Sequence, residues 1–233
     1  MTEWTLIYLV LFVGACLQSV IGFGLGLLCA PILFLILPEL VPAPMILNAL
    51  LLTLLIAIRN HDAINVRQTA FSVIGGTIGV LVASSVMIFL EHHQYRVLFG
   101  VSIVIGVILS AIGFHPRITA YTNVFAGTLS GFMGTVTSAG GAPMGLLYQT
   151  AEHKQIKANL SVFFLYINAF GILTLWLTGA AGSNDFVLFV KCIPAILLGW
   201  GFSWLVNSRI NVDIVRPLVL FVAFCSGLAS IVF

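Results

Sequence analysis

Two long apolar stretches without a charged residue dominate the pattern of the chain, at 4–37 and at 118–151. Each covers 34 residues, and a continuous α-helix of that length would be about 51 Å long. The hydrocarbon core of a bilayer is only about 30 Å thick. Each stretch also contains a Gly-rich interruption that ends in Ala-Pro, at Pro31 and at Pro143. The pattern therefore predicts that each stretch folds back on itself within a membrane.

Three further apolar segments, separated by polar hinges, follow each stretch. They predict helices at roughly 40–58, 68–90 and 94–114 in the first half and at roughly 156–178, 185–207 and 212–233 in the second. The halves also align: superposing Pro31 on Pro143 places Gly22 on Gly134. The sequence thus predicts two repeats, 1–115 and 116–233, within one transmembrane domain. In each repeat, a broken or re-entrant helical hairpin precedes three transmembrane helices.

Composition supports a membrane protein and excludes other classes. Hydrophobic residues make up 61% of the chain and charged residues only 7%, against about 25% charged in soluble domains. We therefore expect an all-α polytopic fold with the bilayer as its solvent. The formal charge of +2 gives no reason to expect a nucleic-acid partner. The four cysteines lie in apolar segments, which predicts buried free thiols rather than a disulfide set, a metal site or a cofactor site.

The distribution of Lys and Arg distinguishes between two topologies. If each long stretch crossed the membrane once, four cations would face one side and five the other, which is no bias. If each stretch crosses and returns, seven cations share one side and only Arg96 and Lys191 lie opposite. The seven are Arg59, Arg67, Arg117, Lys154, Lys157, Arg209 and Arg216. The excess of cations on the cytoplasmic side of membrane proteins favours the second topology, with these seven inside and both termini outside.

An odd number of passes in the first half makes the second half an inverted copy. Inverted repeats with interrupted helices are typical of secondary transporters. The count of cations leaves two geometries open for each long stretch, namely two short crossings or one crossing with a re-entrant hairpin. In either geometry, backbone that leaves the helix at membrane depth must be buried in protein or line a cavity. We therefore expect the two interruptions to face one another inside the protein.

The interruptions are the candidate binding site. Glycines let the backbone approach a ligand closely, and each resuming helix offers unpaired N–H groups at the positive end of its dipole. Candidate substrate-binding residues at the first interruption are Gln18, Ser19, Gly22, Gly24, Gly26, Cys29 and Pro31. Those at the second are Ser130, Gly134, Thr135, Thr137, Ser138, Gly140, Gly141 and Pro143. Asn48, Gln149 and Asn159 would extend the polar lining.

Structural interpretations of the same residues compete with this hypothesis. Gly22 and Gly26 have the Gly-x-x-x-Gly spacing of a helix-packing surface. The hydroxyls of the second interruption can donate to carbonyls of their own helix instead of to a ligand. An enzyme is disfavoured, because no His-Glu-x-x-His motif occurs and no histidine reaches the middle of a span. No Asp or Glu lies deep in a span either, so a coupled proton would travel on the substrate or through another group.

At these motifs the chain resembles the sulfite exporter TauE/SafE family of anion transporters. The resemblance lies in the segment 18–31, in Ser130-Gly-Phe-Met-Gly134 with Gly140-Gly-Ala-Pro143, and in the helix opening at 154–159. It implies a multi-pass cell-membrane carrier that exports sulfite, sulfonates or related small sulfur-containing anions. The chain departs from many members in both Gly-rich segments, so the substrate stays open, as do the coupling ion and the oligomeric state. An anion channel and a carrier of other small organic anions are the alternatives.

Overall fold

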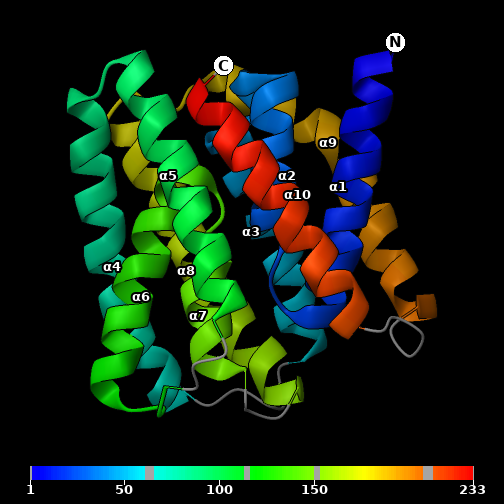
Figure 1. The fold of residues 1–233 in the computed structure, drawn as a ribbon. Helices are drawn as coiled ribbons and strands as arrows, with labels where there is room; N and C mark the ends of the chain where they lie inside the picture. Colours follow the sequence, from blue (N-terminus) through cyan, green and yellow to red (C-terminus); the bar gives the residue numbers. More distant parts are fainter. Residues whose placement is uncertain (1, 61–65, 113–115, 150–152, 207–211, 233) are drawn as a thin grey trace.

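The described part of the chain is entirely helical. The computed structural model describes residues 2–60, 66–112, 116–149, 153–206 and 212–232. Its elements are α1 (Thr2–Ile21), α2 (Leu25–Ile36), a 3-10 turn η1 (Pro38–Leu40), α3 (Ala43–Arg59), α4 (Val66–Phe89), α5 (His92–Ala111), α6 (Ala120–Thr137), α7 (Gly141–Tyr148), α8 (His153–Leu177), α9 (Ser183–Val206) and α10 (Val212–Val232). Figure 1 shows these helices packed side by side. The six helices predicted after the long stretches are confirmed as α3–α5 and α8–α10.

Each long stretch is a hairpin with one long and one short arm. Helix α1 has 20 residues and α2 has 12, which correspond to about 30 and 18 Å. Helix α6 has 18 residues and α7 has eight, or about 27 and 12 Å. The long arms approach the thickness of a membrane, whereas the short arms are too short to span it. The chain therefore reverses direction where the two Gly-rich interruptions lie.

Backbone conformation explains why the helices stop there. Gly22 and Gly24 have φ of 102° and 127°, values that L side chains rarely adopt. The second interruption uses Ser138, which caps α6 in the left-handed conformation with φ of 61°. Helix α7 then begins at Gly141 and carries Pro143 in its first turn, where the missing N–H needs no partner in the helix.

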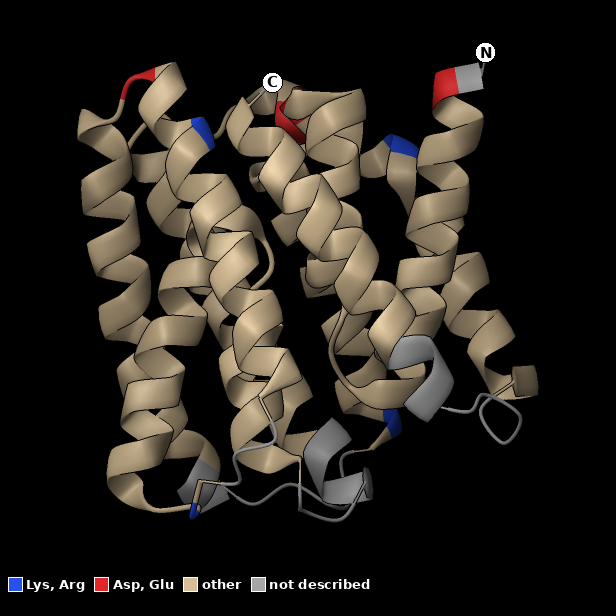
Figure 2. Cartoon of the chain, in the orientation of Figure 1, with Lys and Arg blue, Asp and Glu red and all other residues tan. Residues whose placement is uncertain are grey.

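The chain is a multi-pass membrane protein. Among the described residues, α1, α4, α5, α8 and α9 are long and apolar enough to cross a bilayer. Figure 2 shows the charged residues gathered at the two ends of the bundle, with an uncharged middle between them. Large apolar side chains such as Leu9, Leu198 and Phe221 are exposed on the outside, as a lipid-facing surface requires. The start of α1 and the end of α10 lie at the same end of the bundle (Figure 1).

Two cation–π contacts mark opposite ends of α9. The Lys191 Nζ lies 5.4 Å from the ring centroid of Trp4, near the start of α1. The Arg59 guanidinium, at the end of α3, lies 4.3 Å from the ring centroid of Trp204. Because Lys191 and Trp204 are about 20 Å apart along a helix, Arg59 and Lys191 belong to different ends of the molecule. This is the separation that the distribution of cations predicts for these two residues.

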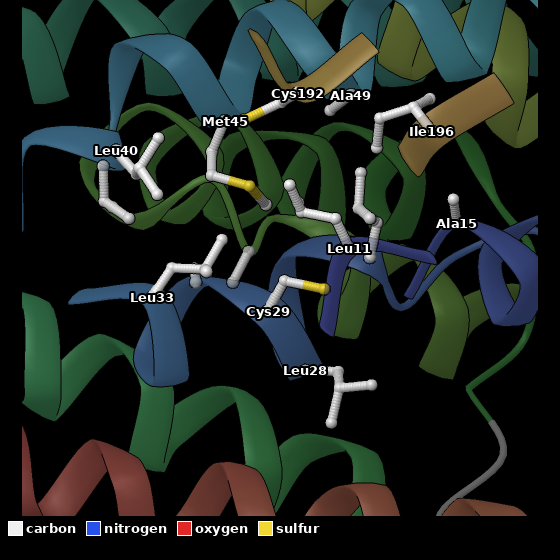
Figure 3. Packing of buried hydrophobic residues seen from close by; sticks show 14 of the residues in the cluster. Leu11, Ala15, Leu28, Cys29, Leu33, Leu40, Met45, Ala49, Cys192 and Ile196 are labelled. Carbon is white, nitrogen blue, oxygen red and sulfur yellow. The ribbon is translucent and has the colours of Figure 1, made fainter. Parts of the chain in front are cut away.

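The helices group into two bundles that do not coincide with the two halves of the sequence. We call α1, α2, α3 and α9 the first bundle, and α4, α6, α7 and α8 the second. Each contributes most of one large apolar cluster, and the cluster of the first bundle also includes Phe99 and Ile103 of α5. Figure 3 shows the cluster of the first bundle, which runs from Leu11 of α1 through Leu33 of α2 and Met45 of α3 to Ile196 of α9. The cluster of the second bundle is centred on Phe163 and is built from α4, α6, α7 and α8.

The first bundle therefore contains α9 from the second half of the sequence, and the second bundle contains α4 from the first half. Glycines permit the very close packing of α4 on α6. A Cβ added at Gly79 of α4 would overlap the Thr128 carbonyl of α6, and one at Gly131 of α6 would overlap the Gly76 carbonyl of α4. On the opposite side, α9 packs on α1 with Gly199 against the Phe12 carbonyl. Helices α5 and α10 pack on each other.

Candidate functional site

The two interruptions meet between the bundles. A Cβ added at Gly26 of α2 would lie 2.6 Å from the carbonyl carbon of Ser138 and 2.8 Å from the Cα of Ala139. The backbones of the two hairpin tips are therefore in direct contact. This confirms the expectation that the interruptions face one another inside the protein.

A small cavity lies at this meeting point. It has a volume of about 20 Å³, and since a water needs about 10–15 Å³ on this measure, it holds about one water in this conformation. Both bundles form its wall. The lining residues are Gln18, Phe23, Gly24, Gly26, Leu27 and Ala49 from the first bundle, and Gly134, Ser138, Gly140, Gly141, Phe164, Ile167 and Asn168 from the second. No member of this lining carries a charge.

Each hairpin tip inserts into the opposite bundle. Ala139 is 1% exposed and belongs to the apolar cluster of the first bundle. In return, the Phe23 ring packs against the cluster of the second bundle. It covers the glycine face of α7 so closely that a Cβ at Gly145 would lie 2.6 Å from Phe23 Cζ. The Ser138 hydroxyl also donates to the Pro42 carbonyl at 2.9 Å, which links the second tip to the start of α3. The tips thus lock the two bundles together.

Gln18 spans the first interruption. Its Oε1 accepts a hydrogen bond from the Leu25 N–H at 3.0 Å, so the side chain of α1 caps the N-terminus of α2. The capping leaves the Nε2 amide group of Gln18 as a donor beside the cavity. Helix geometry leaves the N–H groups of Gly26 and Leu27 without an acceptor in α2, because the first bond of the helix is made by Leu28. Ser19 donates back to the Ala15 carbonyl at 2.7 Å and lies outside the lining.

The hydroxyls of the second interruption donate to the protein itself in this conformation. Thr135 donates to the Gly131 carbonyl at 2.9 Å, and Thr137 donates to the Met133 carbonyl at 2.7 Å. Ser130 donates to the Gly140 carbonyl, and Ser138 donates to α3 as described above. A hydroxyl has one hydrogen to donate. Thr135 and Thr137 follow the back-bonding interpretation, whereas Ser130 and Ser138 donate to carbonyls outside α6. The N–H groups of Gly141 and Ala142 at the start of α7 are the donors that remain on this side.

The structure brings together seven of the candidate residues in the cavity lining: Gln18, Gly24, Gly26, Gly134, Ser138, Gly140 and Gly141. The other candidates lie outside it: Ser19, Gly22, Cys29, Pro31, Asn48, Ser130, Thr135, Thr137, Pro143, Gln149 and Asn159. Cys29 packs inside the first hairpin, with its thiol directed to the Val10 carbonyl at 3.2 Å. Asn48 is 1% exposed, and its Nδ2 donates to the Pro44 carbonyl within α3. Asn159 contacts Thr69 of α4.

Several lining residues were not found from the sequence. Phe164, Ile167 and Asn168 share one face of α8, and Ala49 lies on α3. Of these, Asn168 alone carried a signal, because an amide within an apolar span is expected only where it has a partner or a function. The apolar members resemble any other core residue in a pattern of apolar positions. Among the described residues, no three His, Cys, Asp or Glu side chains come together as a possible metal site.

A family model decides the relationship of the chain to known proteins. The model of the sulfite exporter TauE/SafE family matches residues 6–230, nearly the whole chain. The chain belongs to the TauE/SafE family. Comparisons with curated proteins and with solved structures gave no match. Membership in the TauE/SafE family places the protein among membrane transporters and suggests an exporter of sulfite or related anions. The matched range includes both hairpins and every residue that lines the cavity.

Proposed function

We propose that the protein is a secondary transporter that exports small sulfur-containing oxyanions, such as sulfite or sulfonates, across the cell membrane. The observation that carries the proposal is the meeting of two helix N-termini at a small cavity whose described lining is uncharged. Each N-terminus offers N–H donors, and its dipole is equivalent to about half a positive charge. The substrate would be bound by the first turns of α2 and α7 and by the Gln18 amide.

The charge of this site favours monoanions. Two half-charges sum to about one positive charge, and none of the described residues that line the cavity is ionisable. A sulfonate or a singly protonated sulfite matches that charge, whereas a sulfate dianion would bring an excess negative charge into a poorly solvated site. A transported proton would then travel on the anion itself. The protein should accordingly prefer methanesulfonate over sulfate when the two compete.

Transport requires the two bundles to separate, because a sulfite group has four heavy atoms and the cavity holds about one water. We infer that the structure is a contracted state of an alternating-access cycle. The contacts of α1 with α9 and of α4 with α6 support movement of the bundles as units, whereas the contact between α3 and α8 would have to shift. Opening toward one face would withdraw the Phe23 ring from the glycine face of α7 and break the Ser138–Pro42 hydrogen bond.

An inverted repeat accounts for the way the helices pair. In such a repeat each helix of α1–α5 corresponds in order to one of α6–α10, so α1 corresponds to α6 and α4 to α9. The contact of α1 with α9 then corresponds to the contact of α6 with α4, and the α3–α8 and α5–α10 contacts each join a helix to its own counterpart. We therefore propose the repeats 1–115 and 116–233, with the moving units formed by exchange of α4 and α9 between them. The end bearing Arg59 would face the cytoplasm, and both termini would lie outside.

Counterflow in proteoliposomes tests the proposed function. Purified protein is reconstituted with unlabelled sulfite inside, and the uptake of trace ³⁵S-sulfite from outside is measured. A carrier gives accelerated uptake that saturates with external sulfite, because the loaded site returns faster than the empty one. An anion channel would instead give uptake without saturation that internal sulfite does not accelerate. Repeating the assay with sulfonates, thiosulfate, sulfate and carboxylates identifies the substrate.

A further inference from the structure

Asn168 is a buried amide whose surroundings leave it without a partner. It lies in the middle of α8, is 8% exposed, and lines the cavity. The buried amide of Asn123, by contrast, accepts hydrogen bonds from Ser72 and Tyr148 and donates to the Thr119 carbonyl. Within the described part of the chain, the Asn168 side chain makes no hydrogen bond.

An amide group has two donor hydrogens and one acceptor oxygen. The amide atoms of Asn168 are not among the side-chain atoms that are sealed from solvent without a partner, so they are accessible from the cavity that the residue lines. Their hydrogen bonds are then made to whatever occupies the cavity. Because Asn168 lies at the cavity between the bundles, a ligand in the cavity is the partner that the surrounding protein does not provide. The neighbours that share its face of α8, Phe164 and Ile167, are apolar and cannot bond to it.

The placement of Asn168 gives the cavity donors from three directions. The first turn of α2 contributes N–H groups from the first bundle, and the first turn of α7 contributes them from the second bundle. Asn168 approaches from α8, and its neighbours on that helix line the same wall. The donors therefore come from three sides: α2 together with Gln18, α7, and Asn168 of α8. The three oxygens of a pyramidal SO₃ head group can point to all three sides, whereas the two oxygens of a planar carboxylate point in only two directions.

We propose that Asn168 is a substrate-binding residue that donates its Nδ2–H to one oxygen of an SO₃ head group and so distinguishes sulfite and sulfonates from carboxylates. This inference rests on the proposed function. It adds a residue from α8 to the two helix N-termini and assigns that residue the choice of head group. Asn168 and Gln18 then hold the anion from opposite bundles, so the bound anion joins the two.

Methanesulfonate and acetate are a matched pair of probes, because they differ in the head group and share the methyl group. Affinities of purified protein for both are measured by isothermal titration, with the thermal unfolding midpoint recorded for each variant. Asn168→Leu is close to isosteric and should weaken methanesulfonate binding about 10- to 100-fold, the value of one hydrogen bond to a charged group. Acetate binding should change much less. Asn168→Asp should weaken both anions by adding a negative charge.

Thr53→Val is the control, since Thr53 is a buried residue of α3 whose hydroxyl donates to the Ala49 and Leu50 carbonyls, and it does not line the cavity. It should keep the preference for methanesulfonate. If Asn168→Leu does not fold, Asn168→Ser retains a shorter donor and should show a partial loss of the preference. Wild-type preference retained in a folded Asn168→Leu or Asn168→Ser variant would overturn the inference alone. A wild-type protein that binds neither methanesulfonate nor sulfite would overturn the proposed function with it.

Discussion

Replacing Gly26 with Ala tests whether contact between the two hairpin tips is needed for transport. The added Cβ would lie 2.6 Å from the Ser138 carbonyl carbon and 2.8 Å from the Ala139 Cα. Carbon atoms in contact prefer about 3.5–4.0 Å, and the Ser138 carbonyl oxygen lies closer still to the added Cβ, so the tips must move apart by at least about 1 Å. The obstructing atoms are backbone and cannot rotate away. Overpacking of this kind costs about 1–3 kcal/mol, offset by up to about 1 kcal/mol from the better helix propensity of Ala.

The penalty applies to the contracted state, in which the tips touch, and is relieved when the bundles separate. A bias of about 1–3 kcal/mol reduces the population of that state by about 5- to 150-fold. We expect Gly26→Ala to fold and to lose most sulfite counterflow in proteoliposomes. Gly201→Ala is the matched control, because a Cβ at Gly201 of α9 meets no atom within 4 Å. Counterflow by Gly26→Ala equal to that of Gly201→Ala would refute the requirement for close contact between the tips.

Three further predictions concern the cap, the anchoring of α7 and the topology. Gln18→Glu retains a capping oxygen and should preserve the unfolding midpoint, yet it adds a negative charge to the cavity lining and should abolish anion binding by titration; undiminished binding would remove Gln18 from the site. Tyr148→Phe deletes the 2.7 Å hydrogen bond to Asn123 and should destabilise the protein by about 1 kcal/mol in thermal unfolding without changing the KM for sulfite, whereas a large change in KM would place Tyr148 in the site. A cysteine at His92 should react with an impermeant thiol reagent in intact cells and one at Asn60 only after permeabilisation, and the reverse labelling would overturn the orientation.

Most of the fold could be predicted from the sequence because the membrane imposes length and charge constraints. A 34-residue uncharged stretch is too long to cross once as a straight helix, and the distribution of Lys and Arg favours crossing and returning, so the hairpins followed from length and charge together. The unequal arms did not follow, because apolar composition does not show where a short helix ends inside the membrane. The exchange of α4 and α9 between bundles was also not predicted. It depends on glycine contacts such as Gly79 with Thr128, and a single sequence does not show which helices form them.

The candidate site could be predicted in part. The glycines at the interruptions identified the backbone that reaches the cavity, since positive φ and close approach both require glycine at positions such as Gly24 and Gly26. The hydroxyls were harder to assign, because a Thr in a membrane helix can donate to a ligand or to its own helix, and Thr135 makes the second choice here. Asn168 was missed because its helix lies outside both interruptions, and only the three-dimensional packing brings it to the cavity.

Locating a bound anion tests directly whether the cavity between the two hairpin tips is the binding site. Selenite has the same pyramidal shape as sulfite and contains an anomalous scatterer, so crystals of the protein grown with selenite would show its position at the selenium absorption edge. We expect an anomalous peak in the cavity between Gly26 and Gly141, within hydrogen-bonding reach of Asn168. An ordered selenite elsewhere in the membrane-embedded part, with the cavity between the hairpin tips unoccupied, would contradict this expectation.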